Sequence, residues 1–336
     1  MGLSRRHAIA GVAVALAGCA ELQGQVEKRA DGVLTDDDHP LKGTTTIGIV
    51  DRSDSEHDLE ALTVDAAAFW TDHAAEYADV GVSFRPEPEG PPDVEVVFLD
   101  SRTELAGCEE HASSDILGCA PLLTAEHRPE RPITVEVVVA NRPAGDVRIT
   151  VQHELGHTLG LDHDDEPAYI MSTDIADRLP EYGRRREVLE SFENAWAGRN
   201  SGTQEYNRAV NRWNDGEYDA AAPIFERSAK RYRTTNASVE TALELERGFD
   251  GMERPETVDR DRLRDAFESA GGWTDLAAER SELMALSSEA RADGDVPGAR
   301  ELRAEAEEVF SELQAIDFPA PIEIASALGL LRDGKS

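Results

Sequence analysis

The chain contains almost no lysine. Only Lys28, Lys42, Lys230 and Lys335 are lysines among its 34 basic residues, and these stand against 68 acidic residues, so the formal net charge is −34. A surface with this excess of negative charge repels the phosphate backbone of nucleic acid. We therefore expect no nucleic-acid partner.

The acidic residues are spread along the whole chain and are not gathered in one tail. Their mutual repulsion would strain a folded protein unless salt screens it, because the Debye length falls to roughly 3 Å at 1 M salt. The composition resembles that of salt-adapted, halophilic proteins of haloarchaea, and a merely acidic protein is the alternative. Since 40% of the 336 residues are hydrophobic, the chain has enough apolar material for two domains of ordinary size.

A long apolar run is also missing. A membrane-spanning helix needs about 20 apolar residues, whereas the run near the N-terminus extends only from Ala8 to Ala17. It follows Arg5 and Arg6 and precedes Cys19, which is the outline of an export signal. The letters "SRR" resemble a twin-arginine signal, and "LAGC" resembles a lipobox, whose cysteine becomes lipidated. We therefore expect a signal peptide over residues 1–18.

The signal predicts an exported protein on the outer face of the cytoplasmic membrane. Its only membrane contact would be the lipid anchor on Cys19. Plain secretion is the alternative, in which Cys19 is an incidental residue of a cleaved signal. The following residues 19–43 lack apolar periodicity and are rich in charge, so we expect a disordered tether there.

Cysteine is scarce, and Cys108 and Cys119 are the only cysteines after Cys19. In an oxidising exterior such a pair most simply forms a disulfide. The loop that it closes is short, so the stabilisation should be on the order of 2–3 kcal/mol. Zinc binding by this pair is the weaker alternative, because two thiolates do not complete a tetrahedral site.

The segment after the tether alternates strand-like and helical patterns. Runs rich in β-branched residues predict strands at 44–51, 82–87, 94–100 and 133–140, and an amphipathic pattern predicts a helix at 57–78. A second helix is expected at 144–160, where Val147, Val151, Leu155 and Leu159 form one apolar stripe and Gly160 ends the helix. These patterns predict a domain with helices packed on a sheet, over residues 44–198.

The remainder of the chain predicts an all-α domain over residues 199–336. The polar, glycine-containing run "GRNSGTQ" reads as a break that ends a helix begun near Arg184. Gly216, Tyr218, Ala221, Phe225 and Ser228 match offsets of a tetratricopeptide repeat, and Gly294, Ala299 and Ala306 match part of them. Because the two glycines are not separated by a multiple of the 34-residue period, unspecific helical hairpins are the alternative. A helical domain of either kind more often presents a surface to a protein partner than performs chemistry.

One motif carries metal chemistry. His153 and His157 are four residues apart, so they lie on one face of the predicted helix, and Glu154 is turned about 100° from His153. A catalytic zinc usually has three protein ligands and one open position. Gly160 permits a sharp turn, after which His163 can return to the same ion.

The resulting pattern His-Glu-x-x-His-x-x-Gly-x-x-His, with Met171 eight residues later, resembles the metzincin zinc endopeptidases, and the matrixin branch most of all. The resemblance implies that His153, His157 and His163 bind Zn(II) and that Glu154 is the general base toward the zinc-bound water. It implies that Met171 forms the floor beneath the three rings.

The resemblance covers residues 44–198 and implies an α+β zincin fold, with a twisted mixed sheet, an active-site helix and a C-terminal helix. It implies that the substrate runs along the edge strand, which we place between Cys108 and Leu123. Two features depart from matrixins: Asp164 stands where they usually have serine, and no Pro-Arg-Cys-Gly segment precedes the domain. Latency through such a cysteine is therefore not expected.

We expect a zinc metalloendopeptidase that cuts extracellular polypeptides. The alternative is a surface-anchored helical binding protein whose zinc domain is structural or inactive. A calcium ion at Asp164, Asp165 and Glu166 is possible but unsupported, because no complete ligand loop is present. Tyr169 is either a packing residue or a hydrogen-bond donor in the cleft, and packing is the more common role. His57, His73, His111 and His127 lie in polar surroundings and predict surface positions.

Overall fold

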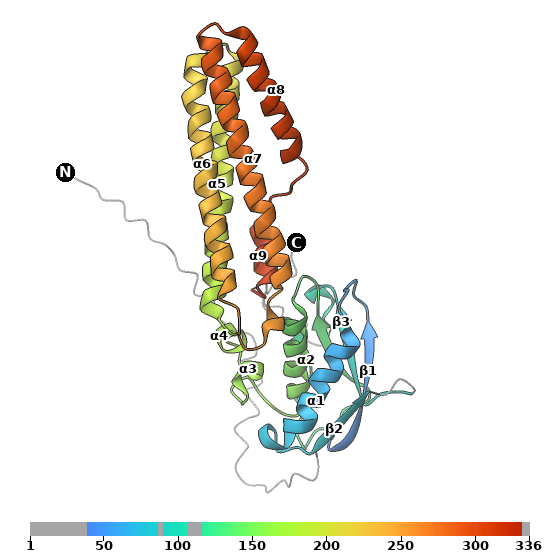
Figure 1. Ribbon diagram of the computed structural model, residues 1–336. Helices are drawn as coiled ribbons and strands as arrows, with labels where there is room; N and C mark the ends of the chain where they lie inside the picture. The colour runs from blue at the N-terminus through green and yellow to red at the C-terminus, as the bar shows by residue number, and fades with distance from the viewer. Residues whose placement is uncertain (1–38, 87–89, 107–115, 331–336) are drawn as a thin grey trace, which may run out of the picture.

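The chain forms two parts in the computed structural model, which describes residues 39–86, 90–106 and 116–330. We call residues 39–181 the sheet domain and residues 182–330 the helical region (Figure 1). The predicted signal peptide, Cys19, Cys108 and His111 lie outside the described residues. Within the described ranges, no helix has the length and apolar character needed to cross a membrane.

The sheet domain contains a five-stranded mixed sheet in the order β2-β1-β3-β5-β4. Four strands are parallel: β1 (Gly43–Asp51), β2 (Val82–Pro86), β3 (Val94–Leu99) and β5 (Ile133–Val138). The short strand β4 (Gly118–Cys119) is antiparallel to β5 and forms one edge of the sheet. The predicted strands and the predicted place of an edge strand are therefore confirmed.

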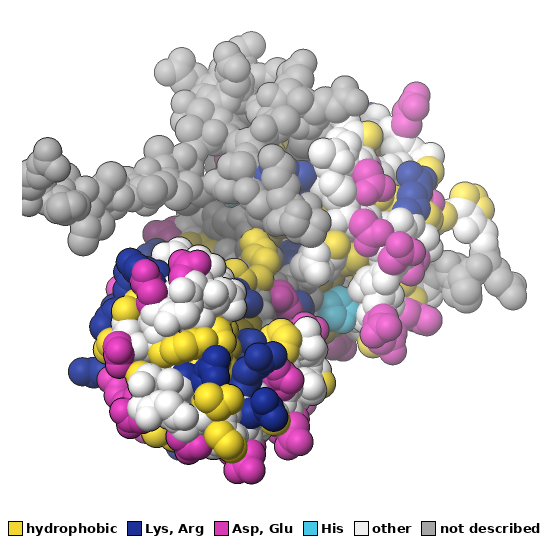
Figure 2. All heavy atoms as spheres, turned by 90° about the horizontal axis from the view of Figure 1, so that it is seen from above, with side chains coloured by type: hydrophobic (Ala, Val, Ile, Leu, Met, Phe, Trp, Pro, Cys, Tyr) yellow, Lys and Arg dark blue, Asp and Glu magenta, His cyan; other side chains and the backbone are white. Residues whose placement is uncertain are grey.

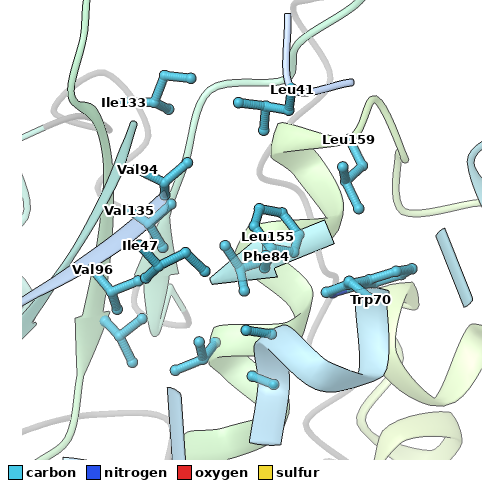
Figure 3. Close-up of a cluster of buried hydrophobic side chains, with 14 of the residues drawn as sticks. Leu41, Ile47, Trp70, Phe84, Val94, Val96, Ile133, Val135, Leu155 and Leu159 are labelled. Atoms are coloured by element: carbon cyan, nitrogen blue, oxygen red, sulfur yellow. The ribbon is translucent and has the colours of Figure 1, made fainter. Parts of the chain in front are cut away.

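Two helices, α1 (Leu59–Tyr77) and α2 (Ala144–Thr158), pack on the sheet and close its main core. The predicted stripe of α2 is buried, since Val147, Val151 and Leu155 are each 0% exposed. In Figure 3, Leu155 and Leu159 lie on the same side of this core as Trp70 of α1, and the valines of β3 and β5 face them from the opposite side. Because full burial of such a side chain contributes roughly 1.5–3 kcal/mol, this stripe fixes the position of α2.

The predicted tether ends earlier than residue 43. Leu41 is 0% exposed in the core of the sheet domain, and the Lys42 amide donates to the His39 carbonyl in a tight turn. Strand β1 then begins at Gly43. A single leucine among polar residues produces no periodicity, which is why the sequence pattern does not reveal that residues 39–43 belong to the fold.

The helical region is all-α, as expected. Its long helices are α5 (Tyr182–Asn214), α6 (Tyr218–Arg247) and α7 (Arg260–Ala292), followed by α8 (Val296–Leu313) and the short α9 (Pro321–Ala327). Figure 1 shows α5, α6 and α7 running side by side and α8 returning along α7. The helices α5 and α6 have 33 and 30 residues, whereas a tetratricopeptide repeat fits two helices into 34. They form long hairpins, which is the alternative that the sequence left open.

The predicted helix break at "GRNSGTQ" is wrong, because α5 continues through it. Gly198 and Gly202 serve a close helix contact: an added Cβ atom would lie 2.6 Å from the Tyr232 ring at position 202 and would clash with the Thr235 hydroxyl at position 198. Residue 199 therefore lies inside a helix and cannot be a linker. The hydrophobic cores instead divide between Met171, which belongs to the sheet domain, and Val188, which belongs to the helical region.

The two parts differ in surface charge. Figure 2, which looks down on the molecule from above, shows basic side chains gathered at the near end of the helical region, whereas acidic side chains predominate on the visible surface of the sheet domain. A separate stretch without acidic residues lies in the middle of two helices, at residues 194–204 of α5 and 227–239 of α6. The helical region therefore departs locally from the acidic character of the chain.

Candidate metal centre

Helix α2 and the turn after it place three histidines around one point. His153 and His157 lie on the last two turns of α2, and Gly160, with φ of +92°, reverses the chain directly after the helix. The Leu161 amide donates to the Gly156 carbonyl at 3.1 Å and closes this turn. The turn brings His163 back to the other two rings, as the sequence predicts.

The three imidazoles are close enough to share one ion. One nitrogen from each ring lies within 4.8 Å of the nitrogens of the other two. The ring centroids of His153 and His157 are 4.6 Å apart, and that of His163 lies 4.8 Å from His157 and 5.2 Å from His153. In the part of the chain that the structure describes, this is the only such cluster that could hold a metal ion.

Hydrogen bonds determine which nitrogen of two rings carries the proton. His153 Nδ1 lies 2.7 Å from the Ile170 carbonyl oxygen, and His157 Nδ1 lies 2.8 Å from the Leu161 carbonyl oxygen. A carbonyl oxygen only accepts, so both Nδ1 atoms are protonated and donate. In neutral rings each Nε2 atom then carries a lone pair, and the two Nε2 atoms face each other at 3.0 Å. Two lone pairs at this distance repel unless a cation lies between or beside them.

Burial keeps these imidazoles neutral. It lowers the pKa of His153 well below the ordinary value and the pKa of His157 to about 4, and the neighbouring histidines add to both effects. Burial also lowers the pKa of His163. Neutral imidazole is the form that binds a metal ion.

Glu154 lies beside the edge strand of the sheet. A Cβ atom added at Gly118 of β4 would lie 2.5 Å from Glu154 Oε1, so only glycine allows the strand to come this close. Glu154 is 5% exposed, and burial raises its pKa to about 8 against the opposing positive charges of Arg178 and Arg142. A carboxyl group with a pKa near neutrality can both accept and return a proton.

Met171 lies under the helix that carries two of the histidines. It ends the short helix α3 (Ala168–Met171) and is 0% exposed. A Cβ atom added at Gly156 would lie 2.5 Å from Met171 Sδ and 3.0 Å from the Trp70 ring. The sulfur therefore packs directly against α2 at Gly156, between His153 and His157 in sequence, and the methionine floor beneath the three rings stays a prediction.

The remaining predicted residues lie around this centre. Asp165 and Glu166 accept hydrogen bonds from the backbone amides of Asp162 and Ala168, so they stabilise the exposed turn. The Tyr169 ring packs edge-on against Phe69 and under the Arg254 guanidinium. Cys119 is buried in β4, and its disulfide with Cys108 stays a prediction because Cys108 is not described.

Sequence reasoning missed three contributors, namely Gly118, Gly156 and Arg178. A glycine inside a helix costs about 1 kcal/mol relative to alanine, so Gly156 within the motif was a signal of close packing. Arg178 belongs to the short helix α4 (Ile175–Arg178). The sequence around Gly118 and around Arg178 contains no pattern that points to the site. They approach Glu154 only through the fold.

Comparison with known proteins adds no family assignment: no protein-family model matches the chain, and no curated protein matches it.

Proposed function

We propose that the protein is an exported zinc endopeptidase of metzincin type. The observation that carries the proposal is the pair of Nε2 atoms of His153 and His157, 3.0 Å apart, with both Nδ1 atoms engaged by carbonyl groups. His163 supplies a third nitrogen, and Glu154 directly follows His153 in α2. Three neutral imidazoles with a fourth position left for water form the ligand set of a catalytic zinc site, and the buried carboxyl beside them is suited to act as the base.

The donor geometry fits zinc. Two nitrogens bound at about 2.0–2.1 Å to one tetrahedral ion are about 3.3 Å apart, close to the 3.0 Å between His153 Nε2 and His157 Nε2. Carbonyl groups that accept from the distal ring nitrogens are the usual outer partners of zinc ligands. A structural zinc would require a fourth protein ligand, whereas among the described residues only three candidate ligands gather. This count favours the enzyme over the structural alternative.

Zinc bound there would polarise the scissile carbonyl group and make water more acidic. Glu154 Oε1 or Oε2 would take the proton from the attacking water as the C–O bond forms and would then deliver it to the amide nitrogen, after which the C–N bond breaks and the amine departs. Burial of Glu154 excludes bulk water from this exchange. The edge strand β4 beside Glu154 would bind an extended polypeptide by strand addition.

The location belongs to the same proposal. The signal "SRRHAIAGVAVALAGC" and the acidic composition predict a lipid-anchored protein that works in a salty exterior on extracellular polypeptides. Mass spectrometry of the mature protein isolated from membranes tests the anchor. We expect a lipid-modified Cys19 at the N-terminus, and an unmodified N-terminus beyond Cys19 would exclude it.

Hydrolysis of a peptide library in high salt tests the activity. We expect cleavage that a chelator abolishes and added zinc restores. Glu154→Gln is the matched control because it keeps the volume of the side chain and removes its basicity. It should retain one zinc per chain and lose roughly 10²–10⁴-fold in rate. Stoichiometric zinc without chelator-sensitive cleavage of any peptide would overturn the enzyme assignment.

A further inference from the structure

The connection between α6 and α7 links the helical region to the sheet domain. Glu256, in the 3₁₀ turn η6 (Pro255–Thr257), forms an ion pair with Arg148 of α2. A Cβ atom added at Gly145, in the first turn of α2, would lie 2.6 Å from the Glu256 backbone. The start of the metal-binding helix therefore packs against a segment of the helical region.

Arg254 extends this contact to the elements that follow the third histidine. Its guanidinium carbon lies 4.9 Å from the centroid of the Tyr169 ring, on α3. Its Nη1 atom donates to the Arg178 carbonyl oxygen, at the end of α4, at 3.0 Å. One side chain of the helical region thus contacts both short helices beside the metal centre.

These short helices need outside support. Helix α3 has four residues, too few to hold a helical turn without tertiary contacts. The Ile170 carbonyl of α3 accepts a hydrogen bond from His153 Nδ1, and Tyr169 directly precedes Ile170. The orientation of one metal ligand therefore depends on how firmly α3 is held, and the Arg254 guanidinium covers one of its four residues.

The backbone at this junction is strained. Four non-glycine residues in the described ranges have positive φ, and three of them lie here: Asn141, Glu181 and Arg254. The Asn141 carbonyl accepts from Ser326 of α9, Glu181 precedes α5, and Arg254 has φ of 54°. Left-handed backbone persists in such residues only where surrounding contacts compensate. At position 254 those contacts are the ones to Tyr169 and Arg178.

We propose that Arg254 is a positioning residue for the metal centre, through which the helical region holds α3 and thereby sets the metal affinity. The helical region is then a support of the site and not only a surface for partners. The inference rests on the metal-binding part of the proposed function, and it does not require peptide hydrolysis.

Metal affinity of the full chain tests the inference, measured with zinc in competition against a chromophoric chelator. Loss of outer-shell support typically weakens metal binding by 10–100-fold, so Arg254→Ala should raise the Kd about tenfold. Arg254→Lys, which keeps the charge and loses the planar stacking surface, should raise it at least threefold. Arg303→Ala removes an arginine paired with Glu307 within α8, and it should leave the Kd unchanged.

Two further measurements distinguish positioning from a general loss of stability. The visible absorption of the Co(II)-loaded protein should shift in Arg254→Ala and stay unchanged in Arg303→Ala, because it reports ligand geometry. In a Tyr169→Leu background, Arg254→Ala should add less than a twofold change in Kd, because the contact between Arg254 and α3 is already gone.

The inference is overturned if folded Arg254→Ala binds zinc with the wild-type Kd and cobalt spectrum, or if its effect is undiminished in Tyr169→Leu. If Arg254→Ala does not fold, a wild-type Kd in Arg254→Lys overturns it instead. A protein that binds zinc but cleaves no peptide would refute the endopeptidase and leave this inference standing. A protein that binds no divalent metal would refute both.

Discussion

One buried arginine of the helical region and one histidine pair of the sheet domain differ in how their polar atoms are paired. In the helical region, Arg185 is 0% exposed, and its guanidinium donates to the carbonyl groups of Pro180, Thr257 and Leu328 and to the Thr257 hydroxyl. In the sheet domain, the buried His153 and the partly buried His157 turn two lone pairs toward each other. The donor nitrogens of Arg185 all have acceptors within the protein, whereas the two histidine lone pairs need a cation as their partner.

This difference separates structural polar groups from functional ones. Burial lowers the pKa of Arg185 to about 10, so it remains charged at neutral pH and its four hydrogen bonds stabilise that charge. Burial of the two imidazoles instead leaves a repulsion between their Nε2 lone pairs, which the fold itself does not relieve. Residues with a perturbed pKa and an incomplete set of partners are found most often at sites that bind a ligand or catalyse a reaction. The two regions should therefore respond differently when their polar groups are removed.

The largest expected effect is that of His157→Ala in the sheet domain. Loss of a direct ligand should weaken zinc binding by more than the roughly 100-fold of outer-shell changes and abolish chelator-sensitive hydrolysis. Without metal, the His157→Ala variant should melt at or above the temperature of the metal-free wild type, because the two lone pairs no longer face each other. Equilibrium dialysis and calorimetry measure the two quantities. His73→Ala, a half-exposed histidine of α1, is the control, and equal zinc affinity in both variants would refute the assignment.

Arg185→Ala, in the helical region, should instead act on stability. It leaves the acceptors at Pro180, Thr257 and Leu328 without a charged donor, and hydrogen bonds to charged groups contribute about 1.5–3 kcal/mol each. We expect a loss of about 3 to 5 kcal/mol in the free energy of unfolding, read from urea titration. The neighbouring Arg184, partly exposed and paired with Glu181, is the control, and Arg184→Ala should cost less than about 1 kcal/mol. Similar losses of unfolding free energy in Arg185→Ala and Arg184→Ala would contradict the structural role of the buried Arg185.

Removal of the metal should destabilise the wild-type protein and leave His157→Ala unaffected. A ligand that binds only the folded state stabilises it by about 2.7 kcal/mol at a hundredfold excess over its Kd. Calorimetry with and without a chelator, at fixed salt concentration, should show a lower melting temperature for the chelated wild type and recovery on adding zinc. An equal shift in His157→Ala would mean that the chelator acts elsewhere.

The histidine cluster was predictable because the residues that form it are close together in the sequence. The candidate ligands His153, His157 and His163 lie within eleven residues, so helical spacing together with the glycine turn places them together. Gly118 and Arg254 were not predictable, because they reach the site through the edge of the sheet and through the α6–α7 connection. The sequence pattern also identifies the apolar stripe of α2, since its spacing matches one face of a helix.

Glycine shows where local patterns mislead. Gly160 ends α2 as predicted, because it takes a positive φ that other residues rarely adopt. Gly198 and Gly202 suggested an ending of the same kind, yet they lie inside α5 and face α6. Whether a glycine stops a helix or lets another helix approach depends on a partner about thirty residues away, and no window of the local sequence contains that partner.

Gly202→Ala sharpens this last point, with the smallest expected effect. Its Cβ atom would lie 2.6 Å from the buried Tyr232 ring, and such overpacking costs typically about 1–3 kcal/mol, more than the roughly 1 kcal/mol gained in helix propensity. We expect net destabilisation in urea titration. Gly272→Ala in α7 is the matched control, because its Cβ atom would meet only Ile316 at 3.6 Å, and it should stabilise the protein by up to about 1 kcal/mol. If Gly202→Ala stabilises the protein as much as Gly272→Ala does, then close approach is not the reason for glycine at 202, and the continuity of α5 would require another explanation.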